Sequence, residues 1–173
     1  MVDLLNDIPS GNGNEVNVII EIPKGSRNKY EYNKKHRVFA FDRILFSPFH
    51  YPADYGFVPQ THCEDGDPLD AYVIMRESTF PGILIKARPV AVMHMNDSGE
   101  TDDKLICVPI DDPFFEGVKD IKDLPSHFLK EIRHFMERYK DLQGKEVKVS
   151  GFEGASKAKD VFKAAVELYK ERE

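Results

Sequence analysis

The sequence predicts a mainly β fold, a small closed barrel with two α-helices packed on its outside. Short apolar segments recur between turns over residues 16–110, and aromatic residues are frequent among them. Two segments with helical spacing of apolar residues follow near the C-terminus, at 125–144 and 156–171. The chain has 173 residues, of which 41% are hydrophobic, so we expect one domain over residues 1–173 with a substantial core.

Seven segments predict strands, because each is a short apolar run or alternates apolar and polar residues between turn residues. They span residues 16–22, 29–32, 37–46, 69–75, 83–95, 104–110 and 145–152. The fifth strand is expected to bend or bulge near Arg88 and Pro89, because Pro cannot donate a hydrogen bond in a central ladder. The polar residues 1–15 predict a loop or an extended arm, and the aromatic residues 49–59 are too often interrupted by Pro for a helix.

Two helices are predicted to close the chain. The first is expected to begin near Pro125, a favoured residue of the first turn, and to stop near Gly144. Its apolar residues follow at spacings of four, three and four, which places them on one helical face: Phe128, Ile132, Phe135 and Tyr139. The second spans 156–171, and its apolar face consists of Ala158, Phe162, Ala165 and Tyr169. Helices with one apolar face are expected to pack against the barrel from outside.

Composition limits the partners and the compartment. The net charge of −6 argues against broad binding to nucleic acid, but a local basic site for a small anion remains compatible with it. The two cysteines, Cys63 and Cys107, make no disulfide framework and are expected to be free thiols in a reducing compartment. No signal segment and no run of membrane-spanning length stands out, so we expect a cytoplasmic protein without a membrane partner.

An acidic turn is the most informative stretch, since three carboxylates lie within six residues: Asp65, Asp67 and Asp70. Gly66 tolerates unusual backbone angles and Pro68 fixes its own, so the turn is expected to be tight and stiff. Mutually repelling carboxylates favour a hard divalent cation, although a solvated acidic turn is the alternative for this motif alone. A calcium-binding EF-hand does not fit, because counting from Asp65 places Asp70 where Gly is required.

Further charged residues are candidates for the same site. The acids are Glu21, Glu31, Asp97 and Asp102, and the bases are Lys29, Arg43, Lys104 and Lys140. Taken singly, each is typical of a solvated surface charge. Each acid is nevertheless predicted at the end of a strand or in a loop beside one. If the mouth of a barrel gathers acids and bases together, it can hold metal ions and a polyanion at once.

Together these motifs resemble the soluble inorganic pyrophosphatases of family I in their short prokaryotic form. The matching pieces keep the family's order and spacing: residues 20–23 (IEIP), 29–31 (KYE), 42–43 (DR), 51–52 (YP), 55–56 (YG), 65–70 (DGDPLD), Asp97, Asp102, Lys104 and 139–140 (YK). The resemblance implies a distorted closed five-stranded barrel of the oligonucleotide/oligosaccharide-binding (OB) shape, with extra strands. It also implies Mg²⁺-dependent hydrolysis of pyrophosphate to two phosphates, and a homohexamer.

The resemblance also implies a role for each matching residue. The metal ligands would be Asp65, Asp70, Asp97, Asp102, Glu21 and Glu31, with several Mg²⁺ ions expected and Mn²⁺ or Zn²⁺ as substitutes. Pyrophosphate would be bound by Lys29, Arg43, Lys104, Tyr139 and Lys140. Asp67 would take the proton from the attacking water, and Tyr55 would hydrogen-bond near this nucleophile. The sequence departs from the family at Ser98, where an acid is common, and at Phe152, where Trp is common, and neither belongs to the central set.

Three other functions fit the sequence less well. A barrel of this shape can bind single-stranded nucleic acid, but that function favours a basic groove, whereas this chain has acidic clusters. A Ca²⁺-stabilised structural protein explains the acids and leaves Lys29, Arg43 and Lys140 without a role. A nucleotide hydrolase of the P-loop type requires a Gly-rich phosphate loop that this sequence lacks.

Overall fold

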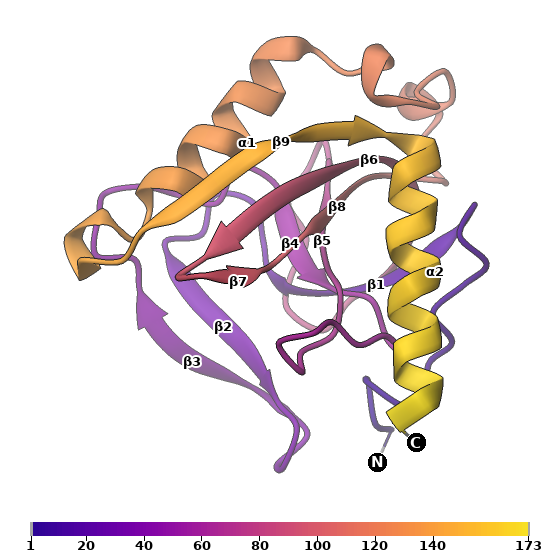
Figure 1. Ribbon diagram of the computed structural model, residues 1–173, viewed down its shortest axis with the longest axis horizontal. Helices are drawn as coiled ribbons and strands as arrows, with labels where there is room; N and C mark the ends of the chain where they lie inside the picture. The colour runs from indigo at the N-terminus through magenta and orange to yellow at the C-terminus, as the bar shows by residue number, and fades with distance from the viewer. Residues whose placement is uncertain (1, 173) are drawn as a thin grey trace.

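The computed structural model describes residues 2–172, in which short strands precede two helices (Figure 1). The strands are β1 (Val16–Ile22), β2 (Asn28–Asn33), β3 (Val38–Ile44), β4 (Asp54–Phe57), β5 (Asp70–Val73), β6 (Leu84–Asp97), β7 (Glu100–Thr101), β8 (Lys104–Pro109) and β9 (Val147–Gly154). The helices are α1 (Ser126–Arg138) and α2 (Ala155–Arg172), with short 3₁₀ helices η1 (Pro113–Phe115), η2 (Ile121–Asp123) and η3 (Asp141–Gln143). The predicted mainly β fold is confirmed.

Five strands close into a ring of backbone pairings. Strand β1 pairs with β4 on one side and with β6 on the other, and the ring continues through β5 and β8. Only the β5–β8 pair is parallel among these five. Closure brings the β1 and β4 backbones so close at Gly56 that a Cβ there would lie 1.8 Å from the carbonyl oxygen of Ile19, so only glycine fits.

Strand β6 is the longest strand of the described chain and links the ring to its additions. It pairs with β1 and β8 inside the ring, and with β7 and β9 beyond it. Its register against β8 shifts between Pro89 and Ala91, which confirms the bulge expected near Pro89. A second register shift, between His94 and Met95, occurs against β9.

Strands β2 and β3 form a separate two-stranded sheet, called the hairpin below. Strand β3 lies within the segment 37–46 that the sequence predicts as a strand, and within the described chain it pairs only with β2. Contact with the ring comes instead from aromatic side chains, since Tyr32 of β2 lies 5.9 Å from the ring of Phe57 in β4. The N-terminal arm packs against this same cluster through Leu4, Leu5 and Ile8.

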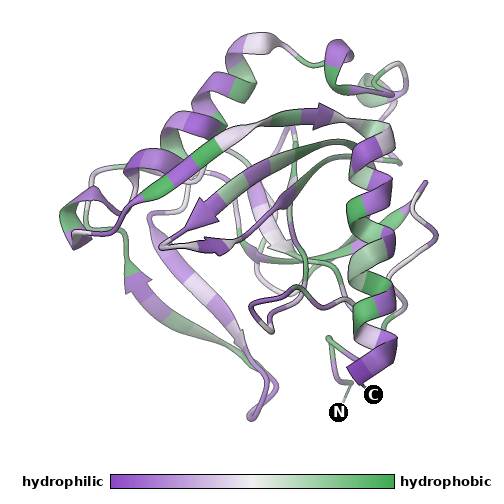
Figure 2. Ribbon diagram, viewed as in Figure 1, coloured by the Kyte–Doolittle hydropathy of each residue, from purple (hydrophilic) through white to green (hydrophobic). Residues whose placement is uncertain are grey.

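The two helices lie outside the ring, α1 along β9 and α2 across β6 (Figure 1). Apolar side chains of both helices are buried in the core, and Figure 2 shows apolar and polar residues following one another along each helix. The predicted apolar face of α2 is buried at Ala158, Phe162, Ala165 and Tyr169. Helix α1 ends at Arg138 rather than near Gly144, because the chain tightens into η3 and turns at Gly144 with φ of 68°. No helix within residues 2–172 is long and apolar enough to cross a membrane.

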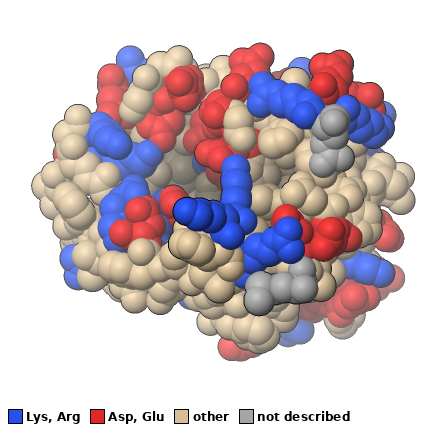
Figure 3. Space-filling model, turned by 90° about the horizontal axis from the view of Figure 1, so that it is seen from below, with Lys and Arg blue, Asp and Glu red and all other residues tan. Residues whose placement is uncertain are grey.

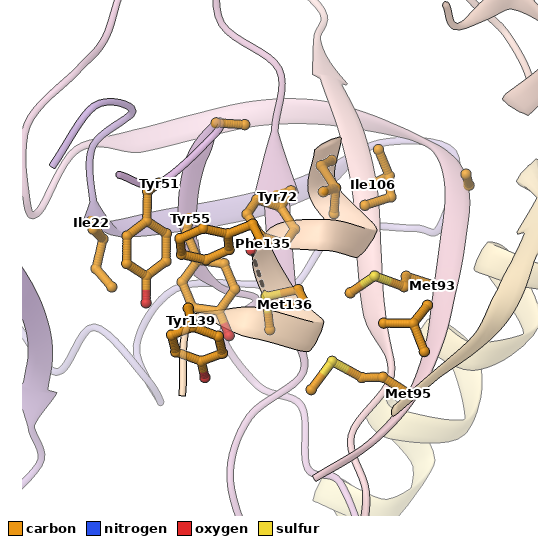
Figure 4. Close-up of a cluster of buried hydrophobic side chains, with 14 of the residues drawn as sticks. Ile22, Tyr51, Tyr55, Tyr72, Met93, Met95, Ile106, Phe135, Met136 and Tyr139 are labelled. Atoms are coloured by element: carbon orange, nitrogen blue, oxygen red, sulfur yellow. Dashed lines mark hydrogen bonds between the residues drawn. The ribbon is translucent and has the colours of Figure 1, made fainter. Parts of the chain in front are cut away.

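A cluster of aromatic and sulfur-containing side chains fills the space between α1 and the ring (Figure 4). The rings of Tyr51 and Phe135 lie 4.8 Å apart, and those of Phe135 and Tyr139 are stacked at 5.1 Å. The hydroxyl of Tyr72 donates a hydrogen bond to the sulfur of Met136, 2.8 Å away. This core fixes the C-terminal end of α1, and with it Tyr139, against the ring.

Candidate active site

One pocket of about 860 Å³ lies between the hairpin and the ring. Every site residue predicted from the sequence lines it: Glu21, Lys29, Glu31, Arg43, Tyr55, Asp65, Asp67, Asp70, Asp97, Asp102, Lys104, Tyr139 and Lys140. These residues come from strands β1 to β6 and β8, the acidic turn, the loop before β8 and the end of α1. Acidic and basic side chains also lie beside one another on the face of the molecule seen in Figure 3.

The acidic turn is tight, as the sequence predicts. Gly66 has φ of 88°, a conformation that favours glycine, and its N–H donates to the carbonyl oxygen of Cys63 at 3.1 Å. The N–H of Asp67 donates to Oδ1 of Asp65 at 3.0 Å, and the N–H of Cys63 donates to the carbonyl oxygen of Asp67 at 2.8 Å. The turn therefore delivers Asp70 to the first position of β5.

Lys104 stands at the centre of the ring side of the pocket. Its ammonium lies 2.7 Å from Oδ2 of Asp70 and 2.7 Å from Oδ1 of Asp102. The parallel pairing of β5 with β8 places Asp70 opposite Lys104 and so explains the contact. Burial alone would lower the pKa of Lys104, which is 2% exposed, but the two carboxylates outweigh it and raise this pKa. The hydroxyl of Tyr55 donates to Oδ2 of Asp70 as well.

The hairpin contributes the opposite wall. The ammonium of Lys29 contacts Glu31 on the same strand and lies 3.2 Å from Oδ2 of Asp42 on β3. The guanidinium of Arg43 also contacts Asp42, while its Nε is buried and has no hydrogen-bond partner among residues 2–172. Arg43 also lines the pocket, where its guanidinium is a donor group suited to an anionic ligand.

A third wall comes from the end of α1 and the end of β6. Lys140 forms an ion pair with Asp97, and its ammonium lies 5.3 Å from the centre of the Tyr139 ring. Burial would raise the pKa of Asp97, but Lys140 outweighs it and lowers this pKa. Ser98 donates from Oγ to Oδ1 of Asp97 at 3.0 Å. The sequence treated Ser98 as remote from the central residues, and this is wrong, because Ser98 contacts one of them.

Glu21 is the acid whose ionisation the fold opposes most clearly. Burial raises its pKa to about 8, and the like charge of Asp70 adds to the shift. The backbone N–H of Tyr32 donates to Oε1 of Glu21 at 2.7 Å and partly counteracts it. A carboxyl group held in this way ionises fully at neutral pH only if further positive charge arrives in the pocket.

Four charged residues with no predicted role also line the pocket: Lys34, Lys35, Asp42 and Lys145. Asp42 links Lys29 and Arg43, and Lys34 reaches from the end of the hairpin to Oδ1 of Asp67 at 3.0 Å. The pairing of Asp42 with Arg43 in one motif pointed to the first of these. Nothing local in the sequence indicates the second, because Lys34 and Asp67 are far apart along the chain.

The carboxylates suit hard divalent cations by their chemistry, since such ions take several oxygen ligands. As they stand, no three acidic, His or Cys side chains within residues 2–172 converge on one point for a metal ion. Lysine ammonium groups lie between several of the acids instead, most closely Lys104 between Asp70 and Asp102. The donor set fits divalent cations, and the existing contacts show that positive charge is already required between the acids.

Carboxylates for cations and basic side chains for anions, facing each other in one pocket, define an enzyme that acts on small phosphate-type anions. The family model of inorganic pyrophosphatase matches residues 18–170. The chain is 51% identical to the inorganic pyrophosphatase of Picrophilus torridus over 156 residues, which covers 90% of this chain and 88% of that one. It is 47% identical to the inorganic pyrophosphatase of Haloferax volcanii over 174 residues, covering 99% of this chain and 98% of the relative.

The fold agrees with these relatives. The crystal structure of inorganic pyrophosphatase from Thermus thermophilus superimposes with a TM-score of 0.94 at 38% identity, covering 98% of this chain and 99% of that one. The chain therefore belongs to the inorganic pyrophosphatase family of enzymes. The resemblance noted in the sequence is confirmed.

Proposed function

We propose that this enzyme hydrolyses inorganic pyrophosphate to two phosphates and requires divalent cations, with Mg²⁺ as the natural ion. The observation that carries the proposal is the single pocket in which six predicted metal-binding carboxylates face five predicted phosphate-binding side chains. Pyrophosphate is small and densely charged, so its hydrolysis needs both kinds of group within a few ångströms.

Six carboxylates would hold the cations: Asp65, Asp70, Asp97, Asp102, Glu21 and Glu31. Bound divalent cations neutralise phosphate charge and lower the pKa of a bound water. Two structural facts support this assignment. Asp70 and Asp102 already share one cation in the form of Lys104, and the raised pKa of Glu21 leaves that carboxyl in need of positive charge.

The phosphate groups would be bound by Lys29, Arg43, Lys104, Tyr139 and Lys140. Arg43 lines the pocket with a guanidinium side chain that is 26% exposed, and Tyr139 offers a neutral hydroxyl beside Lys140. Asp67 would accept the proton of the attacking water, because its side chain is 71% exposed and only Lys34 pairs with it among the described residues. Tyr55 would hold Asp70 in place through its hydroxyl.

The test is phosphate release from pyrophosphate by the purified protein, with Mg²⁺ and with excess EDTA. We expect hydrolysis only with the cation, and much slower release from ATP with Mg²⁺, because no nucleotide loop accompanies the pocket. Full activity in EDTA would refute the metal requirement. Equal rates on ATP and pyrophosphate would refute the substrate.

We also propose a homohexamer, which rests on the family resemblance alone. Light scattering on the peak that elutes from a sizing column measures the mass directly. The expected value is about six times the chain mass of 19.8 kDa, and a mass near 19.8 kDa would refute the hexamer.

A further inference from the structure

His94 lies on β6 outside the pocket, and the proposed reaction gives it no role. Its Nδ1 lies 2.7 Å from Oδ2 of Asp103, and its Nε2 lies 2.7 Å from Oε2 of Glu153. The His94 side chain is 24% exposed. Both nitrogens of the imidazole therefore lie within hydrogen-bond distance of a carboxylate oxygen.

The three residues connect three neighbouring strands, which lie side by side in Figure 1. His94 belongs to β6, Asp103 comes directly before β8, and Glu153 belongs to β9. Strand β6 pairs with β8 on one side and with β9 on the other. The imidazole therefore connects β6 to a residue at each of these two neighbouring strands. Asp103 directly follows the proposed metal ligand Asp102 in the chain, whereas no proposed ligand adjoins Glu153.

Asp103 closes the acidic loop that joins β6 to β8. Its Oδ1 accepts from the N–H of Met95 at 3.3 Å, while its Oδ2 faces His94. The N–H of its neighbour Asp102 donates to the carbonyl oxygen of Met95 at 3.0 Å. Both ends of this short segment are therefore attached to residues 94 and 95 of β6.

Adjacent side chains of an extended segment point to opposite faces. Asp103 points outward to His94, and Asp102 points into the pocket, where its Oδ1 meets the ammonium of Lys104 at 2.7 Å. A rotation of the backbone at Asp103 would consequently move the carboxylate of Asp102. Mutation of a group that holds a metal ligand in place typically costs about 10–100-fold in metal affinity.

We propose that His94 is a positioning residue, which fixes the carboxylate of Asp102 for metal binding through its contact with Asp103. Glu153 contacts the other nitrogen of the imidazole and has no direct part in positioning Asp102. The inference rests on the proposed function, because it takes Asp102 as a metal ligand. It concerns residues outside the family motifs that identified the site.

Two variants at one position separate the two contacts. Asn at position 94 places an amide donor where Nδ1 stands and keeps a partner for Asp103, whereas Gln places it where Nε2 stands and keeps a partner for Glu153. Mg²⁺ binding to the protein without substrate is measured by calorimetry, and thermal unfolding is measured on the same samples. We expect His94→Gln to weaken Mg²⁺ binding about tenfold, and His94→Asn to stay within about twofold of the original protein.

Asp103→Asn changes the same contact from the side of Asp103. It provides the test if a variant at position 94 fails to fold. It should weaken Mg²⁺ binding as His94→Gln does, while Glu153→Gln should not. If all of the variants lose thermal stability and bind Mg²⁺ equally well, His94 only ties strands together and the inference is overturned. Equal weakening in His94→Gln and His94→Asn would overturn it too.

This outcome is separable from the proposed function. Pyrophosphate hydrolysis by the unaltered protein tests that function, and it does not depend on position 94. If the unaltered protein binds no Mg²⁺, both proposals fail. If it binds Mg²⁺ and hydrolyses pyrophosphate while the position 94 variants bind alike, only the inference about His94 fails.

Discussion

The ring and the hairpin face each other across one pocket and hold their charged side chains differently. On the ring, Lys104 is 2% exposed and is fixed at 2.7 Å from both Asp70 and Asp102. On the hairpin, the side chain of Arg43 is 26% exposed and that of Lys34 is 52% exposed. Buried charges must have fixed partners, whereas exposed charges can exchange partners with water.

The difference suggests that the two sheets have separate roles in the site. The ring holds acids in a fixed arrangement, which suits cations that demand regular geometry. The hairpin is a separate sheet attached through Tyr32, Phe39 and the N-terminal arm, so its basic side chains can adjust to an incoming anion. Substitutions should therefore cost stability on the ring and substrate binding on the hairpin.

The largest effect on the reaction is expected at Asp67, where the two regions meet. Asp67→Asn keeps the shape of the turn, because the backbone of Asp67 makes the turn's hydrogen bonds. It removes the proton acceptor, so kcat at saturating Mg²⁺ should fall about 10²–10⁴-fold, while Mg²⁺ binding persists. Steady-state rates and calorimetry measure the two quantities.

Asp70→Asn is the matched control for this prediction, because Asp70 starts β5 and contacts Lys104. It should weaken Mg²⁺ binding first. If Asp67→Asn instead regains full kcat once Mg²⁺ is raised, Asp67 is a metal ligand and the proton acceptor lies elsewhere.

The largest effect on stability is expected at Lys104. Lys104→Met removes the buried cation shared by Asp70 and Asp102 and leaves two half-buried carboxylates facing each other. Breaking a buried ion pair from one side costs about 3–5 kcal/mol, so the free energy of unfolding should fall by that amount. Urea denaturation measures it. A loss no greater than that of Lys148→Met, at a residue 74% exposed, would contradict the comparison.

Arg43→Ala, on the hairpin, should lower kcat/KM for pyrophosphate and leave the stability of the protein nearly unchanged. Its proposed partner is a phosphate oxygen, and a charge-assisted hydrogen bond is worth roughly 1.5–3 kcal/mol, so kcat/KM should fall at least about tenfold. The urea midpoint should stay close to that of the original protein, because the Arg43 and Asp42 side chains are 26% and 28% exposed and water weakens their ion pair. An unchanged kcat/KM would remove Arg43 from the site.

The local elements were predictable from the sequence, because periodicity and turn residues determine them. The alternation in residues 16–22 and the apolar face of residues 156–171 identify β1 and α2 almost to their ends. The bulge at Pro89 follows from the missing donor of proline. These features depend on residues within a few positions of one another.

Long-range features were not predictable in the same way. Closure of the ring depends on β1 pairing with β6, and the separation of the hairpin depends on the ring having no place for β3. The contact between Lys34 and Asp67 and the links from His94 to Asp103 and Glu153 arise from this packing. The site residues were found through the family motifs, and no periodicity would have gathered them.

The smallest effect is expected at Lys34, and it tests whether the hairpin acts on the ring by contact or by charge. The ion pair between Lys34 and Asp67 is exposed on both sides, at 52% and 71%, so water competes for it and salt screens it. We therefore expect Lys34→Gln to raise KM for pyrophosphate less than about fivefold, through the loss of one positive charge at the mouth of the pocket, and to leave kcat unchanged. Lys35→Gln is the matched control, because Lys35 lines the same pocket and its removal changes the charge equally. At low salt concentration both variants should show the same rise in KM. At high salt concentration both should have the KM of the original protein. If Lys34→Gln alone lowers kcat tenfold at any salt concentration, the hairpin acts directly on Asp67, and the division between a fixed ring and an adaptable hairpin does not hold.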